Sequence, residues 1–317
     1  MTDFRRLARA AVLVALLAIV QIQMVGCAAI EQSAGRGHEG ESCPDGPALG
    51  IDHPEKIGIG AWETGPPGWA ADRVAALGAA WYYAWGPKPL AAEETRHHPR
   101  FIPMIRDAAQ LRDDPRALVD IAKSDAPALL GFNEPDQRGQ AEMTAQEAAA
   151  LWPRLMAAGK RLGSPAPATG EALPPDGWLA HFMDAAAASD LRVDFVAIHY
   201  FASRPNLLTF RRYLEWVYHA YDRPIWITEW ALVDPATWKD GRARYSPDEA
   251  ACFFRAGAAM LDDLAFVERH AWFAAFDGSG GWYLNTHAIA ADGTLTPVGR
   301  AFVDATGGPP GGGAQAW

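Results

Sequence analysis

The sequence is poor in positive charge beyond its first nine residues. Its 317 residues include 28 Lys and Arg against 38 Asp and Glu, which gives a formal net charge of −10 at pH 7. No block rich in Lys or Arg follows the N-terminal segment. A strongly negative ligand would be repelled by such a chain. The composition therefore excludes a nucleic acid or an anionic membrane surface as the main ligand.

Several motifs of metal, nucleotide and nucleophilic chemistry are also missing. The sequence contains no His-Glu-x-x-His or Cys-x-x-Cys pattern, and the pair His97-His98 stands alone. No Gly-x-Ser-x-Gly elbow occurs. The run Gly58-Ile59-Gly60 lacks the third glycine of a dinucleotide-binding loop. We therefore expect no metal and no cofactor.

The apolar run near the N-terminus is too short to span a bilayer comfortably. It extends from Ala10 to Val20 after a segment with three arginines, and Gly26-Cys27 follows it. This arrangement resembles a bacterial lipoprotein signal, with cleavage before Cys27 and a lipid on its thiol. We expect residues 1–26 to be the signal peptide of an exported protein, anchored on the periplasmic or cell-surface side. An ordinary secretory signal and a poor membrane anchor are the alternatives.

Only two cysteines remain if Cys27 is lipidated. Cys43 and Cys252 are an even number in an oxidising compartment, so they can form a bridge. Cys252 as a small buried apolar residue is the alternative, and the sequence leaves both open.

The two ends of the chain have the composition of unfolded segments. Residues 27–55 are predicted to be a flexible tether and residues 307–317 a low-complexity tail. The folded domain is expected over residues 56–306.

Eight short apolar runs alternate with helical patterns across this domain. Helix starts are marked by capping residues, as in Thr144 to Glu147, Ser246 to Glu249 and Asp114-Pro115. Alternation of this kind predicts parallel strands, and eight repeats of a domain of about 250 residues predict a single (β/α)8 TIM barrel of the α/β class. An open doubly wound sheet is the alternative. The runs are Lys56–Trp62, Ala79–Trp85, Phe101–Ile105, Ala128–Glu134, Arg161–Ala168, Asp194–Phe201, Pro224–Ala231 and Ala271–Phe276.

Two of these runs end in a glutamate. One closes with Asn133-Glu134 and is stopped by Pro135, and the other closes with Glu229. A glutamate at a strand end is usually a solvated loop residue, but a charge so close to an apolar run needs a reason. In a barrel the C-terminal strand ends form the active site. A pair of carboxylates there is what a glycosidase needs, one to protonate the leaving oxygen and one to attack the sugar or activate water.

Strand alternation gives an expectation for where these carboxylates point. Ile225, Ile227 and Glu229 share one face, so we expect Glu229 to follow two barrel-filling isoleucines inward. The run that ends in Glu134 obeys the same rule. Both carboxylates should therefore lie over the barrel mouth. A separation of about 5–5.5 Å between them would indicate retention of configuration, and a wider gap would indicate inversion.

Aromatic residues accompany the two glutamates. The sequence contains 13 tryptophans, and exposed tryptophan faces stack on sugar rings. Trp85 is the last residue of the second run and precedes Gly86-Pro87, so we expect it in the loop after the second strand, which makes it the best candidate for a stacking platform. For any single tryptophan, core packing is an equal alternative. The composition suits an uncharged glycan as the ligand.

Four motifs occur in order across nearly the whole folded body. They are Gly131-Phe132-Asn133-Glu134-Pro135-Asp136, Leu162-Gly163-Ser164-Pro165-Ala166, Asp194-Phe195-Val196-Ala197-Ile198-His199-Tyr200 and Ile225-Trp226-Ile227-Thr228-Glu229. Together they resemble glycoside hydrolase family 128, of the clan of retaining (β/α)8 glycosidases. The resemblance implies an endo-β-1,3-glucanase that works by double displacement.

The resemblance also implies roles for individual residues. Glu134 matches the general acid/base and Glu229 the nucleophile, while Asn133 matches the residue that holds the sugar 2-hydroxyl. His199 and Tyr200 match a pair on the sixth strand that orients the site.

Two tryptophans are expected near the sugar subsites for the same reason. Trp272 resembles the tryptophan of the family's last strand, and Trp230 stands where the family commonly has Phe. With Asn133, His199, Tyr200 and Trp85 they complete the expected substrate-binding set.

Two other functions remain as alternatives. One is a hydrolase of the same clan acting on β-1,4-mannan or β-1,4-glucan. The other is a surface lipoprotein that binds glycan without cleaving it. We expect a monomer whose partner is a β-glucan oligosaccharide or polysaccharide.

Overall fold

Parallel strands and helices alternate along the chain from residue 50 onward. The computed structural model describes residues 50–91, 99–234, 243–278 and 284–308. These residues belong to one unit, residues 45–317. The expected signal peptide with Cys27, most of the tether and nearly all of the tail lie outside the described residues. Among the described helices, none has the length and apolar character needed to cross a membrane.

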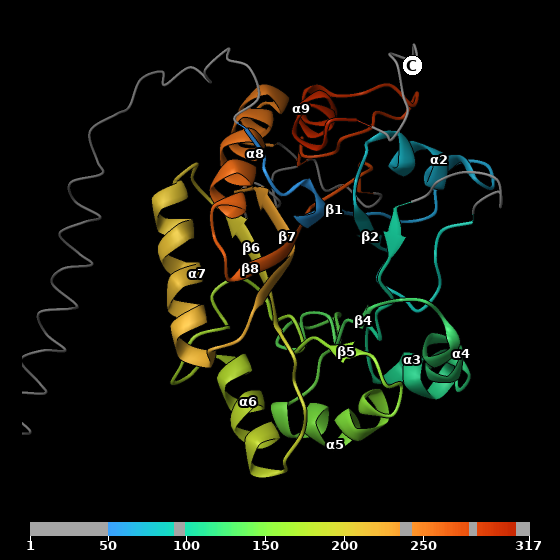
Figure 1. Ribbon diagram of the computed structural model, residues 1–317, viewed down its shortest axis with the longest axis vertical. Coiled ribbons are helices and arrows are strands. Elements are labelled where there is room, and N and C mark those ends of the chain that lie inside the picture. The colour runs from blue at the N-terminus through green and yellow to red at the C-terminus, as the bar shows by residue number, and fades with distance from the viewer. Residues whose placement is uncertain (1–49, 92–98, 235–242, 279–283, 309–317) are drawn as a thin grey trace, which may run out of the picture. The chain divides into compact units, whose positions relative to one another are not determined.

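The elements follow one another in the order that the sequence predicts (Figure 1). Helices α5, α6, α7 and α8 lie outside the strands. The strands are β1 (Ile57–Gly60), β2 (Trp81–Tyr83), β3 (Arg100–Phe101), β4 (Ala128–Leu129), β5 (Arg161–Leu162), β6 (Val196–Ala202), β7 (Ile225–Leu232) and β8 (Val267–Trp272). The helices are the 3-10 turn η1 (Pro54–Lys56), α2 (Trp69–Ala76), α3 (Ala108–Asp113), α4 (Ala117–Lys123), α5 (Ala145–Met156), α6 (Trp178–Ala188), α7 (Leu207–Tyr221), α8 (Pro247–Asp262) and α9 (Pro297–Thr306).

The eight strands are all parallel and form a ring. Six of them pair in the order β3-β2-β1-β8-β7-β6, and β4 pairs with β5. Two single parallel bridges join these sheets, Met104 with Leu130 and Gly163 with Phe195. Backbone hydrogen bonds support both joints, from Leu130 N to Pro103 O at 2.9 Å and from Ser164 N to Phe195 O at 3.0 Å. The expected (β/α)8 barrel is thus confirmed.

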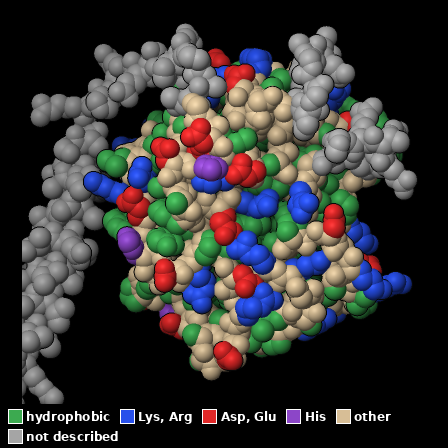
Figure 2. Space-filling view, in the orientation of Figure 1, with side chains coloured by type: hydrophobic (Ala, Val, Ile, Leu, Met, Phe, Trp, Pro, Cys, Tyr) green, Lys and Arg blue, Asp and Glu red, His purple; other side chains and the backbone are tan. Residues whose placement is uncertain are grey.

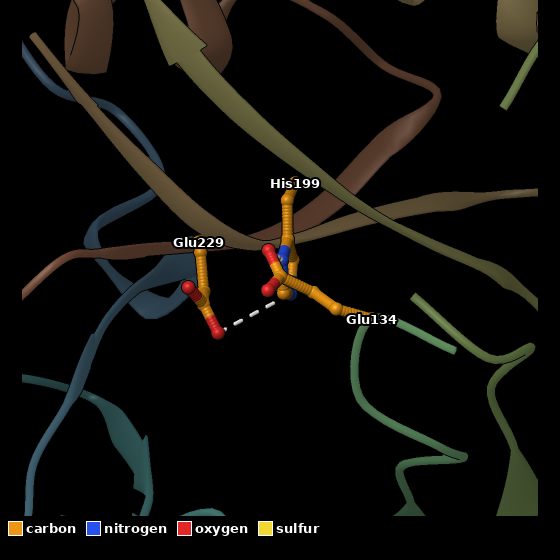
Figure 3. Close-up of side chains that lie close together, drawn as sticks. All are labelled: Glu134, His199 and Glu229. Carbon is orange, nitrogen blue, oxygen red and sulfur yellow. Dashed lines mark hydrogen bonds and ion pairs between the residues drawn. The ribbon is translucent and has the colours of Figure 1, made fainter. Parts of the chain in front are cut away.

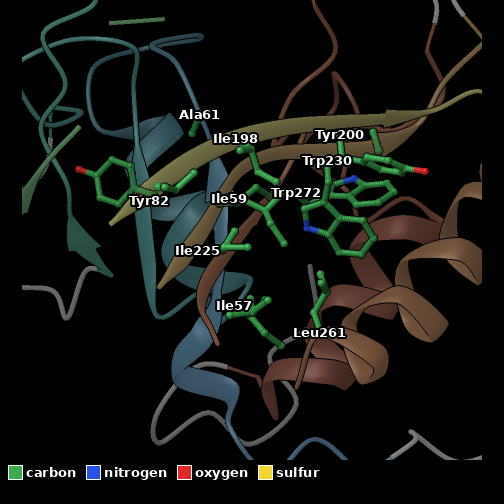
Figure 4. Packing of buried hydrophobic residues seen from close by; sticks show 14 of the residues in the cluster. Ile57, Ile59, Ala61, Tyr82, Ile198, Tyr200, Ile225, Trp230, Leu261 and Trp272 are labelled. Atoms are coloured by element: carbon green, nitrogen blue, oxygen red, sulfur yellow. The ribbon is translucent and has the colours of Figure 1, made fainter. Parts of the chain in front are cut away.

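The apolar residues divide into an inner and an outer cluster. The inner cluster fills the barrel and includes Trp81, Leu130, Phe195 and Trp226. Rings of Trp226 and Phe195 stack at 4.2 Å between their centres. The outer cluster packs strands against helices and contains the remaining large apolar side chains, among them those drawn in Figure 4.

Ile225 and Ile227 belong to the outer cluster and do not fill the barrel. The expectation that they point inward with Glu229 is therefore wrong. On β7 it is Trp226, the residue between them, that packs into the interior. Period-two alternation holds from Ile225 to Ile227, but its phase could not be read from a strand that is apolar on both faces.

Capping residues position most helix starts as the sequence predicts. Complete capping boxes are present at Thr144 with Glu147 and at Ser246 with Glu249. Asp114 does not cap α4, which begins at Ala117. The last strand was also misplaced, since β8 spans Val267–Trp272 and not the run that starts at Ala271.

Cys252 on α8 forms a disulfide. The reading of Cys252 as a free buried thiol is therefore wrong. The sequence offers only Cys27 and Cys43 as partners, and both lie outside the described residues.

Charges of both signs are interspersed on the face of the molecule shown in Figure 2. Lys and Arg side chains alternate there with Asp and Glu. This face therefore carries no extended field of one sign.

Asp262 ties the start of the barrel to the end of α8. Its carboxylate accepts hydrogen bonds from Asp52 N at 2.8 Å and from His53 N at 3.0 Å. Lys56 Nζ donates to the Asp262 carbonyl oxygen at 2.7 Å. Asp262 is buried, so these backbone N–H groups lose their acceptor if its carboxylate is removed.

We expect Asp262→Ala to lower the free energy of unfolding by about 1–3 kcal/mol, because it leaves two donors without a partner. Urea unfolding followed by tryptophan fluorescence measures this. The matched control is Asp263→Ala, which removes an exposed carboxylate next to it and should change stability by less than about 0.5 kcal/mol. Equal effects of the two substitutions would contradict the role of Asp262.

Candidate active site

Glu134 lies just beyond the C-terminal end of β4 in an unusual backbone conformation. Its φ is +40°, in the left-handed region that non-glycine residues rarely adopt. Two backbone hydrogen bonds hold it there, from Glu134 N to Ala166 O at 2.8 Å and from Gln137 N to Glu134 O at 2.9 Å. Such strain persists only where the surroundings impose it, and it is frequent at functional sites.

Glu229 lies within β7 and reaches the barrel mouth through a β-bulge. Ile198 of β6 pairs with Ile227 and His199 pairs with Glu229, so Thr228 is the extra residue. Trp226 points inward, and strict alternation would turn Glu229 outward toward the helices. The bulge shifts the phase by one residue and turns the Glu229 side chain into the site. Its neighbour Trp230 then packs outward on Phe254.

His199 lies between the two carboxylates (Figure 3). Its Nδ1 is 3.0 Å from Glu134 Oε1, at hydrogen-bond geometry. Its Nε2 is 3.3 Å from Glu229 Oε1, at ion-pair distance but without hydrogen-bond geometry. The imidazole is completely buried. A single cation at this place can therefore offset the repulsion between two acidic groups.

Two further side chains donate hydrogen bonds to Glu229. Trp85 Nε1 donates to Glu229 Oε1 at 2.8 Å, and the Tyr83 hydroxyl donates to the same oxygen at 3.1 Å. Within the described residues no hydrogen bond reaches Oε2. One oxygen of Glu229 is thus held by the protein, and the other is available.

The pKa values of this cluster follow from burial and charge. Burial raises the pKa of Glu229 above its usual value, and the charge of Glu134 adds to this. His199, Trp85 and Tyr83 act in the opposite direction but do not outweigh burial. For His199, burial lowers the pKa, but Glu229 and Glu134 together hold it above its usual value. A protonated His199 is therefore stabilised by the pair.

A groove of about 820 Å³ opens over these residues. Asn133, Glu134 and Glu229 lie on its floor. Aromatic side chains line one part, and polar side chains line another. The aromatic set is Trp62, Trp85, Phe201, Phe273 and Phe276, and the polar set includes Arg106, Gln137, Arg138, Gln140 and Thr169.

The same three central residues have the donor set of a metal site. One ligand atom each from Glu134, His199 and Glu229 lies within 4.8 Å of the others. Carboxylate and imidazole are ligands of many divalent ions. Here, however, His199 already uses Nδ1 to bond Glu134, and Glu229 Oε1 accepts from Tyr83 and Trp85. These hydrogen bonds are those expected of a cluster of acidic and basic side chains that interact with one another.

Half of the expected substrate-binding residues line the groove or its floor. Asn133 and Trp85 line it, and His199 contacts both carboxylates below it. The other three lie in the outer core. Tyr200 stacks on Phe210 at 3.9 Å between ring centres, and Trp230 contacts Trp272 at 4.7 Å.

Figure 4 shows Tyr200, Trp230 and Trp272 grouped together. The expectation that they contact sugar is corrected by their position. Tyr200 follows His199 and Trp230 follows Glu229, and neighbouring residues on a strand face opposite sides of the sheet. His199 and Glu229 face the site, and the aromatic residue that follows each of them packs against the helices. Trp272 is completely buried and donates from Nε1 to Thr286 O.

The roles of three residues of the site were not predicted from the sequence. Tyr83 donates a hydrogen bond to Glu229. Arg106 and Gln140 both line the groove. Tyr83 could have been found from its spacing to Trp85, since i and i+2 share a face. Arg106 and Gln140 lie in loops, where no periodic signal exists.

The chain matches a known family over most of its length. Residues 65–302 match the family described as glycosyl hydrolase catalytic core. Among curated proteins, alkali-sensitive linkage protein 1 of Schizosaccharomyces pombe is 28% identical over 252 residues. The match covers 77% of this chain, and the chain spans only 43% of that relative's length.

Solved structures of family 128 glycoside hydrolases have the same fold. A subgroup I endo-β-1,3-glucanase from Amycolatopsis mediterranei, in complex with laminaritriose, is 36% identical with a TM-score of 0.65. The match covers 80% of this chain and 99% of that one. A subgroup II endo-β-1,3-glucanase from Sorangium cellulosum is 26% identical with a TM-score of 0.61, covering 78% and 98%. The family resemblance expected from the motifs is confirmed.

We expect Tyr83→Phe to raise the pKa of Glu229 further above its usual value. The substitution removes one hydrogen bond that favours the ionised carboxylate and keeps the ring in place. Carbon-13 NMR titration of labelled glutamate carboxyls measures the change. Tyr200→Phe is the control, because its hydroxyl lies on the other side of β6. An unchanged Glu229 titration in Tyr83→Phe would contradict the hydrogen bond.

Proposed function

Because the chain belongs to the glycosyl hydrolase catalytic-core family and to glycoside hydrolase family 128, we propose that it hydrolyses β-1,3-glucan with retention of configuration. The observation that carries this proposal is the separation of the two carboxylates. One oxygen of Glu134 lies within 4.8 Å of one oxygen of Glu229, across the floor of one groove. This upper limit is shorter than the spacing of about 5–5.5 Å in retaining enzymes and well below the gap of about 6.5–9.5 Å in inverting ones, so it favours retention.

In the first step Glu229 is the nucleophile and Glu134 the general acid. Oε2 of Glu229 attacks the anomeric carbon, while Glu134 gives its proton to the glycosidic oxygen as that bond breaks. Tyr83 and Trp85 hold Oε1 of Glu229 and favour its ionised form. The products are a glycosyl ester on Glu229 and a shortened glucan.

In the second step Glu134, now ionised, takes a proton from water. The hydroxyl attacks the anomeric carbon on the face opposite Glu229, and the ester bond breaks. Two inversions give net retention. The negative charge lies on Glu229 before the first step and on Glu134 after it. Because protonated His199 contacts both carboxylates, it stabilises whichever of the two is ionised.

The substrate is proposed from the relatives and from the groove wall. The Amycolatopsis enzyme was crystallised with laminaritriose, and variants lacking one or the other of two glutamates were crystallised with laminari-oligosaccharides. The sequence separation of those two glutamates is almost the same as that of Glu134 and Glu229. In this chain the aromatic side of the groove, with Trp62, Trp85 and Phe273, offers flat apolar faces for neutral sugar rings.

We also propose that the protein is exported and carries a lipid on Cys27. Support comes from the sequence pattern around residues 5–27 alone. Mass spectrometry of the N-terminal peptide after expression in a bacterial host should find a lipidated cysteine in place of residues 1–26. A mature N-terminus at any other residue would refute the lipid anchor and leave the hydrolase proposal intact.

The test of the mechanism uses azide with variants at each glutamate. The substrate is an aryl β-laminari-oligosaccharide with a good leaving group. In Glu229→Ala, azide should occupy the space of the lost carboxylate and give the α-glycosyl azide, because a single displacement inverts. In Glu134→Ala, azide should open the ester on Glu229 and give the β-glycosyl azide.

On laminarin, Glu134→Ala should lower kcat by about 10²–10⁴-fold, and Glu229→Ala should abolish release of reducing ends. Glu147→Ala, which removes a surface glutamate from α5, should retain activity. If Glu134→Ala gave the α-glycosyl azide and Glu229→Ala the β-glycosyl azide, Glu134 would be the nucleophile and Glu229 the general acid. Release from β-1,4-mannan or β-1,4-glucan, but not from laminarin, would refute the substrate. Tight binding of laminari-oligosaccharides without any turnover would instead favour a non-catalytic glycan-binding protein.

A further inference from the structure

Asn133 carries an unpaired hydrogen-bond acceptor at the floor of the groove. The residue is only 2% exposed, and its Oδ1 has no hydrogen-bond partner in the part of the chain that the structure describes. Leaving a buried carbonyl without a donor costs about 1–3 kcal/mol. Oδ1 is therefore expected to receive a donor from whatever fills the groove, directly beside Glu134.

The orientation of the Asn133 amide is set by Gln140. Asn133 Nδ2 donates to Gln140 Oε1 at 3.3 Å. The same Gln140 oxygen accepts from Arg106 Nη2 at 2.9 Å. A guanidinium has only donors, so the Gln140 atom that faces it must be the oxygen. An amide oxygen can only accept hydrogen bonds. The Asn133 atom that faces it must therefore be the donor, which is the amide nitrogen Nδ2.

Arg106 is in turn held by its own neighbours. Its Nη1 lies 3.1 Å from Asp107 Oδ2, and Asp107 Oδ1 accepts from Gln110 N at the start of α3. The Arg106 carbonyl oxygen also accepts a hydrogen bond from Asn133 N at 2.9 Å. A chain of polar contacts thus runs from the N-terminus of α3 to the amide beside Glu134.

We propose that Arg106 and Gln140 are positioning residues that fix Asn133 as an acceptor toward the sugar. With its nitrogen bound to Gln140, Asn133 presents only Oδ1 to the groove. It then pairs with a sugar substituent that donates a hydrogen bond, such as the 2-hydroxyl next to the reacting carbon. A substituent without a donor at this position, a hydrogen or a fluorine, leaves Oδ1 unpaired. This inference rests on the proposed function and adds the residues that determine selectivity at one hydroxyl.

The test compares two substrates in several variants. One substrate is an aryl β-laminari-oligosaccharide, and the other is its analogue lacking the 2-hydroxyl on the reacting glucose. The quantity compared is kcat/KM for the substrate with the 2-hydroxyl divided by kcat/KM for the analogue without it. General effects of a substitution on the enzyme cancel in this ratio. Comparing the ratio between variants also removes the intrinsic reactivity of the analogue. In Gln140→Leu the Asn133 amide is free to turn, so this ratio should fall about tenfold.

Two companion variants separate positioning from folding. Gln140→Glu keeps an acceptor oxygen for both Arg106 and Asn133, so it should restore the ratio to the wild-type value. Arg106→Met removes the donor-only partner and should lower the ratio as Gln140→Leu does, which provides a second route if one variant folds poorly. The matched control is Gln146→Leu, an exposed position at the start of α5, which should leave the ratio unchanged. A melting curve on each variant checks that it is folded.

The outcomes distinguish this inference from the proposed function. If the wild-type protein cleaves the aryl substrate but Gln140→Leu and Arg106→Met keep the wild-type ratio, the positioning role is refuted and the function stands. If the wild-type protein cleaves neither substrate, the proposed function fails and the inference fails with it. A tenfold fall that Gln140→Glu reverses supports the inference.

Discussion

Burying the carboxylate of Glu229 is the constraint on which the rest of the site depends. The residue is 4% exposed at the mouth of a barrel filled with aromatic rings. An unpaired charge in such a place would cost several kcal/mol. Tyr83 and Trp85 near β2 and His199 on β6 supply the compensation. Three segments that are far apart in the chain must therefore meet correctly before the carboxylate can be tolerated, which links folding of the barrel to assembly of the site.

Two local departures from regular structure deliver the carboxylates. The bulge at Thr228 turns Glu229 inward, and the left-handed backbone at Glu134 aims the other carboxylate across the groove. Both features break the simple rules for strands, and both occur where the site needs them. Regular strands below them form the rigid base, so the strain is confined to the C-terminal edge.

The groove has two sides with different tasks. Its aromatic side offers broad faces that suit any neutral sugar ring, and such contacts give area more than selectivity. Its polar side contains Arg106 and Gln140, whose donor and acceptor pattern leaves the Asn133 amide one orientation. In the function that we propose, selectivity at a single hydroxyl comes from this polar side, where the hydrogen bonds fix the Asn133 amide.

The sequence by itself determined the barrel and the two glutamates. Eight apolar runs separated by capped helices leave few alternatives to closure. Glu134 ends one of these runs and Glu229 lies within another, and both runs are too apolar to lie at the surface. The sequence also predicts that His199 and Tyr200, as neighbours on one strand, face opposite sides of the sheet. The resemblance to the family nevertheless assigned both of them to the site.

Only the tertiary structure decided the phase of β7, because a strand apolar on both faces has no sequence signal for which face is inside. It also decided which partners Glu229 and Asn133 have. Tyr83, Arg106 and Gln140 approach from other strands and loops, and contacts between segments distant in the chain leave no local pattern to read.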